Sequence, residues 1–132
     1  MRDTNHRLHA LIVEDEVLIS VFAAEALQDM GFDSVEVGSA KAAMDQARTN
    51  DFDVALVDVG LPDRPGNELI AELRTVRADL PVIVTTGYSN RALQDQLQSE
   101  PQVVIVRKPY DVAQLHAAVR ALSLPISRDA PI

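Results

Sequence analysis

Residues 53–66 have the sequence DVALVDVGLPDRPG, and the fold can be worked out from this stretch. Val54 to Val57 form a continuous apolar run rich in β-branched residues, which indicates a strand buried on both faces, as in a parallel sheet. Asp58 ends the run, and the glycines and prolines that follow it prevent the strand from continuing. The Asp58 side chain is therefore expected at the carboxyl end of a strand, the edge at which open α/β sheets bind ligands.

The rest of the chain alternates between strand-like and helix-like segments. Four further strands are predicted at residues 8–13, 34–37, 82–85 and 103–106. Apolar residues three or four positions apart predict a helix after each strand, within residues 19–30, 43–47, 69–76, 90–99 and 115–122. This alternation predicts an α/β protein with a doubly wound, five-stranded parallel sheet and helices on both faces. The alternation alone does not give the strand order.

Details of these helices can be compared directly with a structure. The first helix is predicted to bury one apolar stripe, made up of Ile19, Phe22, Ala23, Ala26, Leu27 and Met30. Ser39 and Asp111 are predicted N-caps. Few residues between Asn90 and Ser99 are apolar, so this helix is expected to be the least firmly anchored.

Composition limits the possible functions. The 132 residues are expected to form one domain, with a core at about residues 8–123 and a polar tail at each end. The chain has no cysteine, which excludes disulfides and thiolate metal sites. A net charge of −8 with scattered arginines argues against direct nucleic-acid binding. No apolar run is long enough for a bilayer and no signal peptide is evident, so we expect a cytoplasmic protein with no membrane contact.

Chemically reactive side chains are expected to meet at one edge of the sheet. Glu14 and Asp15, Asp58, Thr86 and Lys108 follow or end four of the predicted strands, and parallel strands share their carboxyl edge. Three carboxylates within about 4 Å of one another would repel by roughly 4 kcal/mol per pair, so they need a cation. Ligands that are all oxygen favour Mg²⁺. Lys108 and Thr86 could then hold a phosphoryl group, with Asp58 as the nucleophile that forms an acyl phosphate.

These motifs together resemble the receiver domains of two-component response regulators. The resemblance covers about residues 8–123 and rests on the acidic pair, on Asp58 in DVGLPDRPG, on Thr86 with Gly87, and on Lys108 with Pro109. It implies a flavodoxin-like (βα)5 fold with strand order 2-1-3-4-5. It also implies Mg²⁺ and a partner histidine kinase or histidine phosphotransfer protein, from which Asp58 takes its phosphoryl group.

The resemblance also assigns roles to individual residues. Asp15 and Asp58 would bind the ion directly, Gly60 would offer its backbone carbonyl, and Glu14 would act through water. The peptide bond before Pro109 would be cis. The protein would be a signalling switch rather than an enzyme with turnover, a monomer or weak dimer. It would act on a downstream protein target or within its own hybrid kinase, and because the chain ends soon after its last helix, output is expected through protein contact.

The chain departs from the family pattern in two ways. Ile105 stands three residues before Lys108, where a switching Tyr or Phe is usual. The response to phosphorylation is therefore expected to pass through Tyr88 or through residues 90–99. The second departure is Gly60, where many receivers carry a longer side chain, together with the bulky Tyr88 two residues after Thr86. These two positions flank the expected approach of water to the acyl phosphate. Gly60 should leave that approach open and Tyr88 should partly cover it, so Tyr88→Ala is expected to shorten the lifetime of the acyl phosphate.

Other interpretations remain at this stage. A phosphatase or phosphotransferase of the haloacid dehalogenase type would also form an aspartyl phosphate, but it needs a second Asp where this chain has Gly60. Flavin or nucleotide binding would need a Gly-rich or Ser/Thr-rich loop after the first strand, where this chain has acidic residues. Each reactive residue taken singly has an ordinary structural explanation, such as a turn or a strand end. The inference rests on their coincidence at one edge.

Overall fold

The computed structural model describes residues 7–87 and 91–124. Within these residues, strands and helices alternate along the chain. The strands are β1 (Leu8–Val13), β2 (Phe32–Val37), β3 (Val54–Asp58), β4 (Val82–Thr86) and β5 (Val103–Arg107). The helices are α1 (Val17–Asp29), α2 (Ala40–Thr49), α3 (Gly66–Val76), α4 (Arg91–Gln98) and α5 (Val112–Ala121). All strand pairs are parallel and the order is β2-β1-β3-β4-β5, which confirms the predicted fold and strand order.

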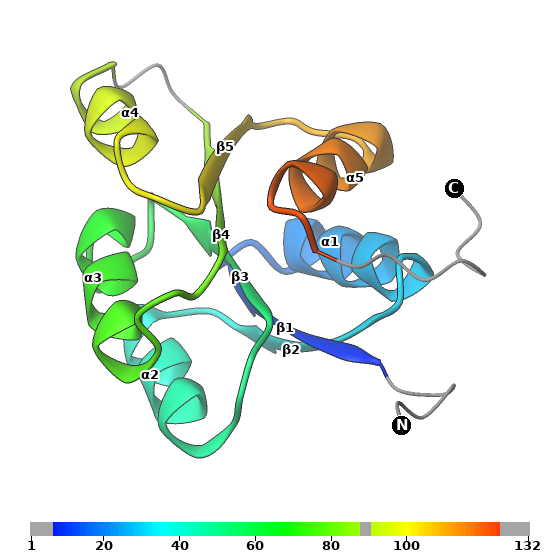
Figure 1. Ribbon diagram of the computed structural model, residues 1–132, viewed down its shortest axis with the longest axis horizontal. Coiled ribbons are helices and arrows are strands. Elements are labelled where there is room, and N and C mark those ends of the chain that lie inside the picture. The colour runs from blue at the N-terminus through cyan, green and yellow to red at the C-terminus, as the bar shows by residue number, and fades with distance from the viewer. Residues whose placement is uncertain (1–6, 88–90, 125–132) are drawn as a thin grey trace.

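The sheet is covered on both faces (Figure 1). α2, α3 and α4 lie on one face, and α1 and α5 lie on the other. Successive residues of β1 enter opposite cores: Leu11 and Val13 pack with the α2 and α3 side, whereas Ala10 and Ile12 pack with the α1 and α5 side. Every residue of β3 and of β4 is buried, as expected for strands in the middle of a doubly wound sheet.

The first helix departs from its predicted stripe. Ala23, Ala26, Leu27 and Met30 are buried as predicted, but Ile19 is only partly buried and Phe22 is 38% exposed. Ser20 faces inward instead, and its hydroxyl donates to Oε1 of Glu36 at 2.7 Å. The prediction was wrong at Phe22 because α1 is apolar nearly all round, with Val17, Leu18 and Val21 exposed as well. A helix of that kind gives no single stripe from which its buried face can be chosen.

The local signals for helix ends were more accurate. Ser39 caps α2 by accepting from the Ala42 amide, and Asp111 caps α5 within a capping box completed by Gln114. Gly31 follows α1 with φ of 104°, a conformation that suits glycine. β2 begins at Phe32, two residues earlier than predicted, because the buried Phe32 pairs with Leu8. Among the α4 side chains that the structure describes, Leu97 alone is buried.

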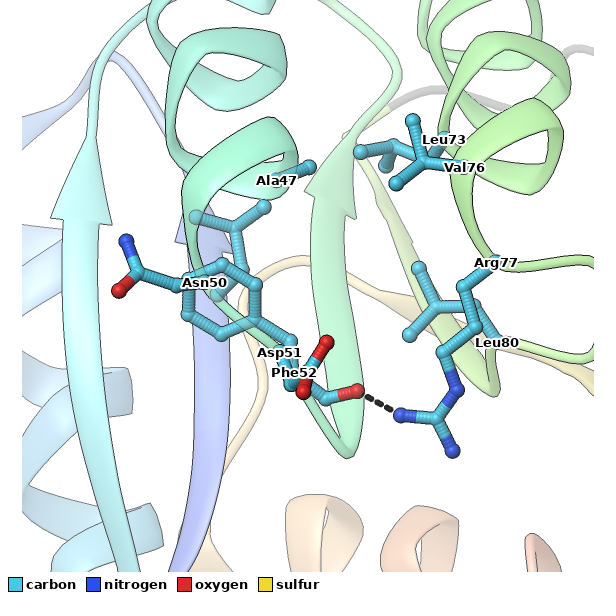
Figure 2. Close-up of a pocket in the computed structure, with 9 residues that line it drawn as sticks. Ala47, Asn50, Asp51, Phe52, Leu73, Val76, Arg77 and Leu80 are labelled. Carbon is cyan, nitrogen blue, oxygen red and sulfur yellow. Dashed lines mark hydrogen bonds between the residues drawn. The ribbon is translucent and has the colours of Figure 1, made fainter.

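A hollow of about 120 Å³ is lined by the last turns of α2 and α3, near the amino ends of β3 and β4 (Figure 2). Ala47, Leu73, Val76 and Leu80 contribute apolar groups to its wall. The Arg77 guanidinium donates to the Phe52 carbonyl beside it. This hollow lies at the opposite edge of the sheet from the candidate site described below. Separately, none of the helices in the described part of the chain is long and apolar enough to span a membrane.

Candidate functional site

The predicted site residues meet at the carboxyl edge of the sheet. Asp58 is the last residue of β3 and Thr86 is the last residue of β4. Glu14 and Asp15 directly follow β1, and Lys108 directly follows β5. Asp58 pairs in register with Thr85, and Thr86 pairs with Arg107, so the ends of β3, β4 and β5 are level. Parallel pairing therefore collects residues that are far apart in the sequence.

Three carboxylates form the centre of this edge. Glu14, Asp15 and Asp58 each offer a carboxylate oxygen, and these oxygens all lie within 4.8 Å of one another. Glu14 is 3% exposed and Asp58 is 5% exposed, whereas Asp15 is open to solvent. Carboxylates this close repel one another, and a hard divalent cation with oxygen ligands relieves that repulsion. The donor set therefore fits such an ion, entering from the exposed side at Asp15.

Lys108 supplies the balancing positive charge within the protein. Its Nζ atom lies 2.7 Å from Oε1 of Glu14 and 3.2 Å from Oδ2 of Asp58. Burial alone would lower the pKa of Lys108, but the hydrogen bond to Glu14 and the charge of Asp58 outweigh burial and raise this pKa. Lys108 is therefore a fixed ammonium group at neutral pH, held between two acids.

The oxygens of Glu14 and Asp58 differ in how they are engaged. Oε1 of Glu14 is paired with Lys108, and Oε2 accepts from the Glu16 amide at 3.1 Å. Burial raises the pKa of Glu14, and these two interactions oppose the rise. Oδ1 of Asp58 accepts from the Gly60 amide at 3.0 Å. Glu14 thus has both oxygens engaged, which fits an indirect role in binding an ion.

Gly60, Thr86 and the peptide bond between Lys108 and Pro109 also lie at this edge. Gly60 is exposed, and a Cβ atom placed on it would lie 3.7 Å from Oδ1 of Asp58, an ordinary contact distance. Thr86 is 4% exposed, and its carbonyl accepts from the Lys108 amide at 2.8 Å. The Lys108–Pro109 peptide bond is cis, as the resemblance implied. Ile105 is partly buried in β5, and Tyr88 lies outside the described residues.

Two residues near the site were not recognised from the sequence. The Tyr110 hydroxyl is shielded from solvent, and burial raises the pKa of Tyr110 to about 12 with a further contribution from the charge of Glu14. Its ring packs against Phe22, with 5.9 Å between the ring centres. Asp63 bonds to the start of α2, a contact between distant segments that no local pattern reveals.

The fold and this edge define a doubly wound α/β domain with a site for a divalent cation and a lysine beside it. A family model for the response regulator receiver domain matches residues 10–120. The chain therefore belongs to the family of response regulator receiver domains, which act in two-component signal transduction. The acidic cluster of Glu14, Asp15 and Asp58 fits the phosphoacceptor site of that family.

Individual relatives agree with this assignment. The transcriptional regulatory protein PdtaR of Mycobacterium tuberculosis (strain CDC 1551 / Oshkosh) is 31% identical over 119 residues, which cover 89% of this chain and 56% of that protein. The sensor kinase CckA of Brucella abortus (strain 2308) is 28% identical over 114 residues, covering 85% of this chain and 12% of that protein. A CheY-like receiver domain from Methanospirillum hungatei JF-1 matches in structure with a TM-score of 0.81 at 23% identity, covering 89% of this chain and 95% of that one.

The comparisons also bear on the alternative interpretations. They support a receiver domain and give no support to a phosphatase of the haloacid dehalogenase type. The chain spans about half the length of PdtaR and a much smaller share of CckA. Its relatives thus include a transcriptional regulatory protein and a sensor kinase.

Proposed function

We propose that Asp58 accepts a phosphoryl group from a phosphohistidine on a histidine kinase or histidine phosphotransfer protein. A carboxylate oxygen of Asp58 would form the new bond to phosphorus, the bond from phosphorus to the donor imidazole would break, and the imidazole would keep the bonding electrons and take up a proton. The observation that carries this proposal is the convergence of three acid side chains within 4.8 Å, with the Lys108 ammonium group 3.2 Å from Asp58.

We assign the metal site to Mg²⁺, held by Asp15, Asp58 and the Gly60 carbonyl, with Glu14 acting through water. The all-oxygen donor set and the exposed position of Asp15 suit an ion that keeps part of its water shell. When bound, Mg²⁺ would offset the negative charge of the incoming phosphoryl group. Lys108 would pair with a phosphoryl oxygen, and the Thr86 hydroxyl would donate a hydrogen bond to another.

The donor protein would dock on an apolar surface beside Asp58. The exposed side chains of α1 include Val17, Leu18 and Phe22, of which Leu18 is 86% exposed. Next to them a groove of about 250 Å³ is lined by Leu18, Phe22, Pro109 and Tyr110. A phosphohistidine has to reach Asp58 from the carboxyl edge of the sheet, so its protein would meet this surface, which we call the α1 docking surface.

The residues around Asp58 suit a signalling switch better than an enzyme that turns over an external substrate. Gly60 has no side chain that could act as an acid or base two residues after Asp58, so sustained hydrolysis of external phosphoesters has no catalyst at that position. Phosphorylation would therefore change the surface of the domain, and that surface would be recognised by a protein target or by the rest of a hybrid kinase. The phosphoryl group of a histidine kinase originates from ATP, so we assign this reaction to the cytoplasm.

The experiment that tests the proposal is phosphorylation by a small-molecule phosphodonor in Mg²⁺, followed by intact mass and peptide mapping. The wild-type chain should gain one phosphoryl group, within the peptide that carries Asp58, and Asp58→Asn should gain none. Asp53→Asn is the matched control, because Asp53 precedes the same strand and accepts from the His9 amide at the other edge of the sheet. A wild-type chain that gains no phosphoryl group, or an Asp58→Asn variant that gains one, would refute the proposal.

A further inference from the structure

Asp63 joins the loop after β3 to the first turn of α2. Its Oδ1 accepts from the Ala40 amide at 2.9 Å, and its Oδ2 accepts from the Lys41 amide at 3.0 Å. These hydrogen bonds, that of Ala40 first, lower the pKa of Asp63 below its ordinary value of 3.8, so the side chain is an anion at neutral pH. One exposed side chain thus bridges two segments that are distant in sequence.

The start of α2 lies next to the backbone of Glu14 and Asp15. α2 starts two residues after Gly38, at the end of β2. The Glu14 amide donates to the Val37 carbonyl at 3.0 Å, and a Cβ atom on Gly38 would lie 3.9 Å from Cα of Asp15. The start of α2 therefore adjoins the side of the site formed by Glu14 and Asp15.

The other segment that Asp63 joins is the loop of residues 59–65, which contains Gly60. The loop is closed at its base, because the Gly66 amide donates to the Val59 carbonyl at 3.2 Å and the Val59 amide donates to the Thr85 carbonyl at 3.1 Å. Leu61 is buried in the core below the loop. The loop is thus held at its base and through Leu61, so we expect a restraint on Asp63 to act also on Gly60, three residues away.

We propose that Asp63 is a positioning residue for the metal site, holding the Gly60 carbonyl at a fixed separation from Asp15. This inference rests on the proposed function. The hydrogen bonds of Asp63 close a ring that runs from the acidic pair through the start of α2 and the loop to Asp58. At their other ends α2 and α3 line the hollow beside Arg77 instead (Figure 2).

Ser39 provides a matched control for this role. Its Oγ accepts from the Ala42 amide at 3.1 Å and caps the same helix, but it makes no hydrogen bond to the loop. Ser39→Ala and Asp63→Ala therefore both remove acceptors from the first turn of α2, and Asp63→Ala alone separates α2 from the loop. If Asp63 served only as a helix cap, the two substitutions would have the same consequences.

The experiment measures Mg²⁺ binding by titration calorimetry and the rate of phosphorylation by a small-molecule phosphodonor over a range of Mg²⁺ concentrations. Asp63→Ala should weaken Mg²⁺ binding about tenfold, as is typical when a residue that supports a metal ligand is removed. The rate at saturating Mg²⁺ should change little, because Asp58 and Lys108 are untouched. Asp63→Asn should fall between Asp63→Ala and wild type, because its Oδ1 can still accept one hydrogen bond. Ser39→Ala should bind Mg²⁺ like the wild-type protein.

Equal Mg²⁺ affinity in Asp63→Ala and Ser39→Ala, whether both are weakened or both are normal, would overturn the inference. If Asp63→Ala does not fold, Asp63→Asn decides instead, and wild-type affinity in a folded Asp63→Asn would overturn it. A wild-type protein that binds no Mg²⁺ and gains no phosphoryl group would refute the proposed function itself. A wild-type protein that does both, alongside an unaffected Asp63→Ala, would refute the role of Asp63 alone.

Discussion

Nζ of Lys108 lies 2.7 Å from Oε1 of Glu14, although 94 positions of sequence separate the two residues. The Glu14 side chain is fully shielded and the Lys108 side chain is 13% exposed, so this pair is held inside the edge of the sheet. Such a pair adds little to the overall stability of a protein, but removing one member leaves the other as an unpaired buried charge. The same ammonium group also contacts Asp58, so its loss would leave two carboxylates facing each other.

The Lys108→Met variant should therefore be less stable than wild type, and Mg²⁺ should restore part of the loss. We expect a decrease of about 3 kcal/mol in the free energy of unfolding without metal, the lower end for a buried pair because the site opens to solvent at Asp15. Urea unfolding with and without Mg²⁺ measures both values. Lys41→Met removes the other lysine of the chain, whose side chain is 80% exposed, and should change stability by less than about 1 kcal/mol. A loss for Lys108→Met that Mg²⁺ does not reduce would contradict this account.

Gly66→Ala should destabilise the domain, even though alanine favours helix. A Cβ atom on Gly66 would lie 2.7 Å from Cα of Val59 and 2.9 Å from the Asp58 carbonyl oxygen, and backbone atoms cannot rotate away. Overpacking of this kind costs about 1–3 kcal/mol. Thermal melting measures the loss, and Gly87→Ala is the control, because nothing lies within 4 Å of its added Cβ. Equal melting temperatures for the two variants would argue against the tight approach of α3 to β3.

Tyr110 should remain protonated at a pH at which an ordinary tyrosine is ionised. Burial raises the pKa of Tyr110 from 10.0 to about 12, so the folded protein holds this proton more tightly than the unfolded chain does. The associated stabilisation is complete below pH 10.0 and is lost as pH rises through about 12. The ultraviolet titration of Tyr88→Phe isolates Tyr110, since the chain has two tyrosines. A midpoint near 10.0 in the folded state would show that the hydroxyl is hydrated.

Leu18→Ser should separate partner docking from the chemistry at Asp58. Leu18 is 86% exposed, so the substitution should leave stability within about 0.5 kcal/mol of wild type. Transfer from a purified phosphohistidine protein that phosphorylates the wild-type chain should slow, because apolar contact on the α1 docking surface is lost, and uptake from a small-molecule donor should not change. Val76→Ser is the control, an exposed valine of α3 beside the hollow at the opposite edge. Equal transfer rates for Leu18→Ser and Val76→Ser would show that the donor protein docks on a different surface.

Much of the fold could be predicted because its strands are short and continuously apolar. Val54 to Val57 and Val82 to Thr85 give the buried centre of the sheet directly. The strand order came from resemblance to a family, because alternation of strands and helices is compatible with several orders. The buried face of α1 could not be predicted correctly, because its position depends on the Ser20 to Glu36 hydrogen bond and on packing with α5.

The site residues were predictable for a simple geometric reason. Residues that end parallel strands must share an edge, so Asp58, Thr86 and Lys108 could be brought together without coordinates. Contacts from the middle of loops follow no such rule. Asp63 accepts from the Ala40 amide 23 positions away in the sequence, and the position of the Tyr110 hydroxyl, close enough to Glu14 for that charge to help raise its pKa, follows from the path of the chain after β5. Neither feature has a local sequence signature.

The site is complete only when the last strand of the sheet is present. Glu14 and Asp15 are synthesised early, whereas Lys108 follows β5, the last strand. Until that strand has left the exit tunnel, the emerging acids have no ammonium group to meet, and a nascent chain that ends before it cannot complete the charge balance seen between Lys108, Glu14 and Asp58. An unfinished or prematurely terminated product should therefore be inert as a phosphoacceptor, so that only completed molecules take part in signalling.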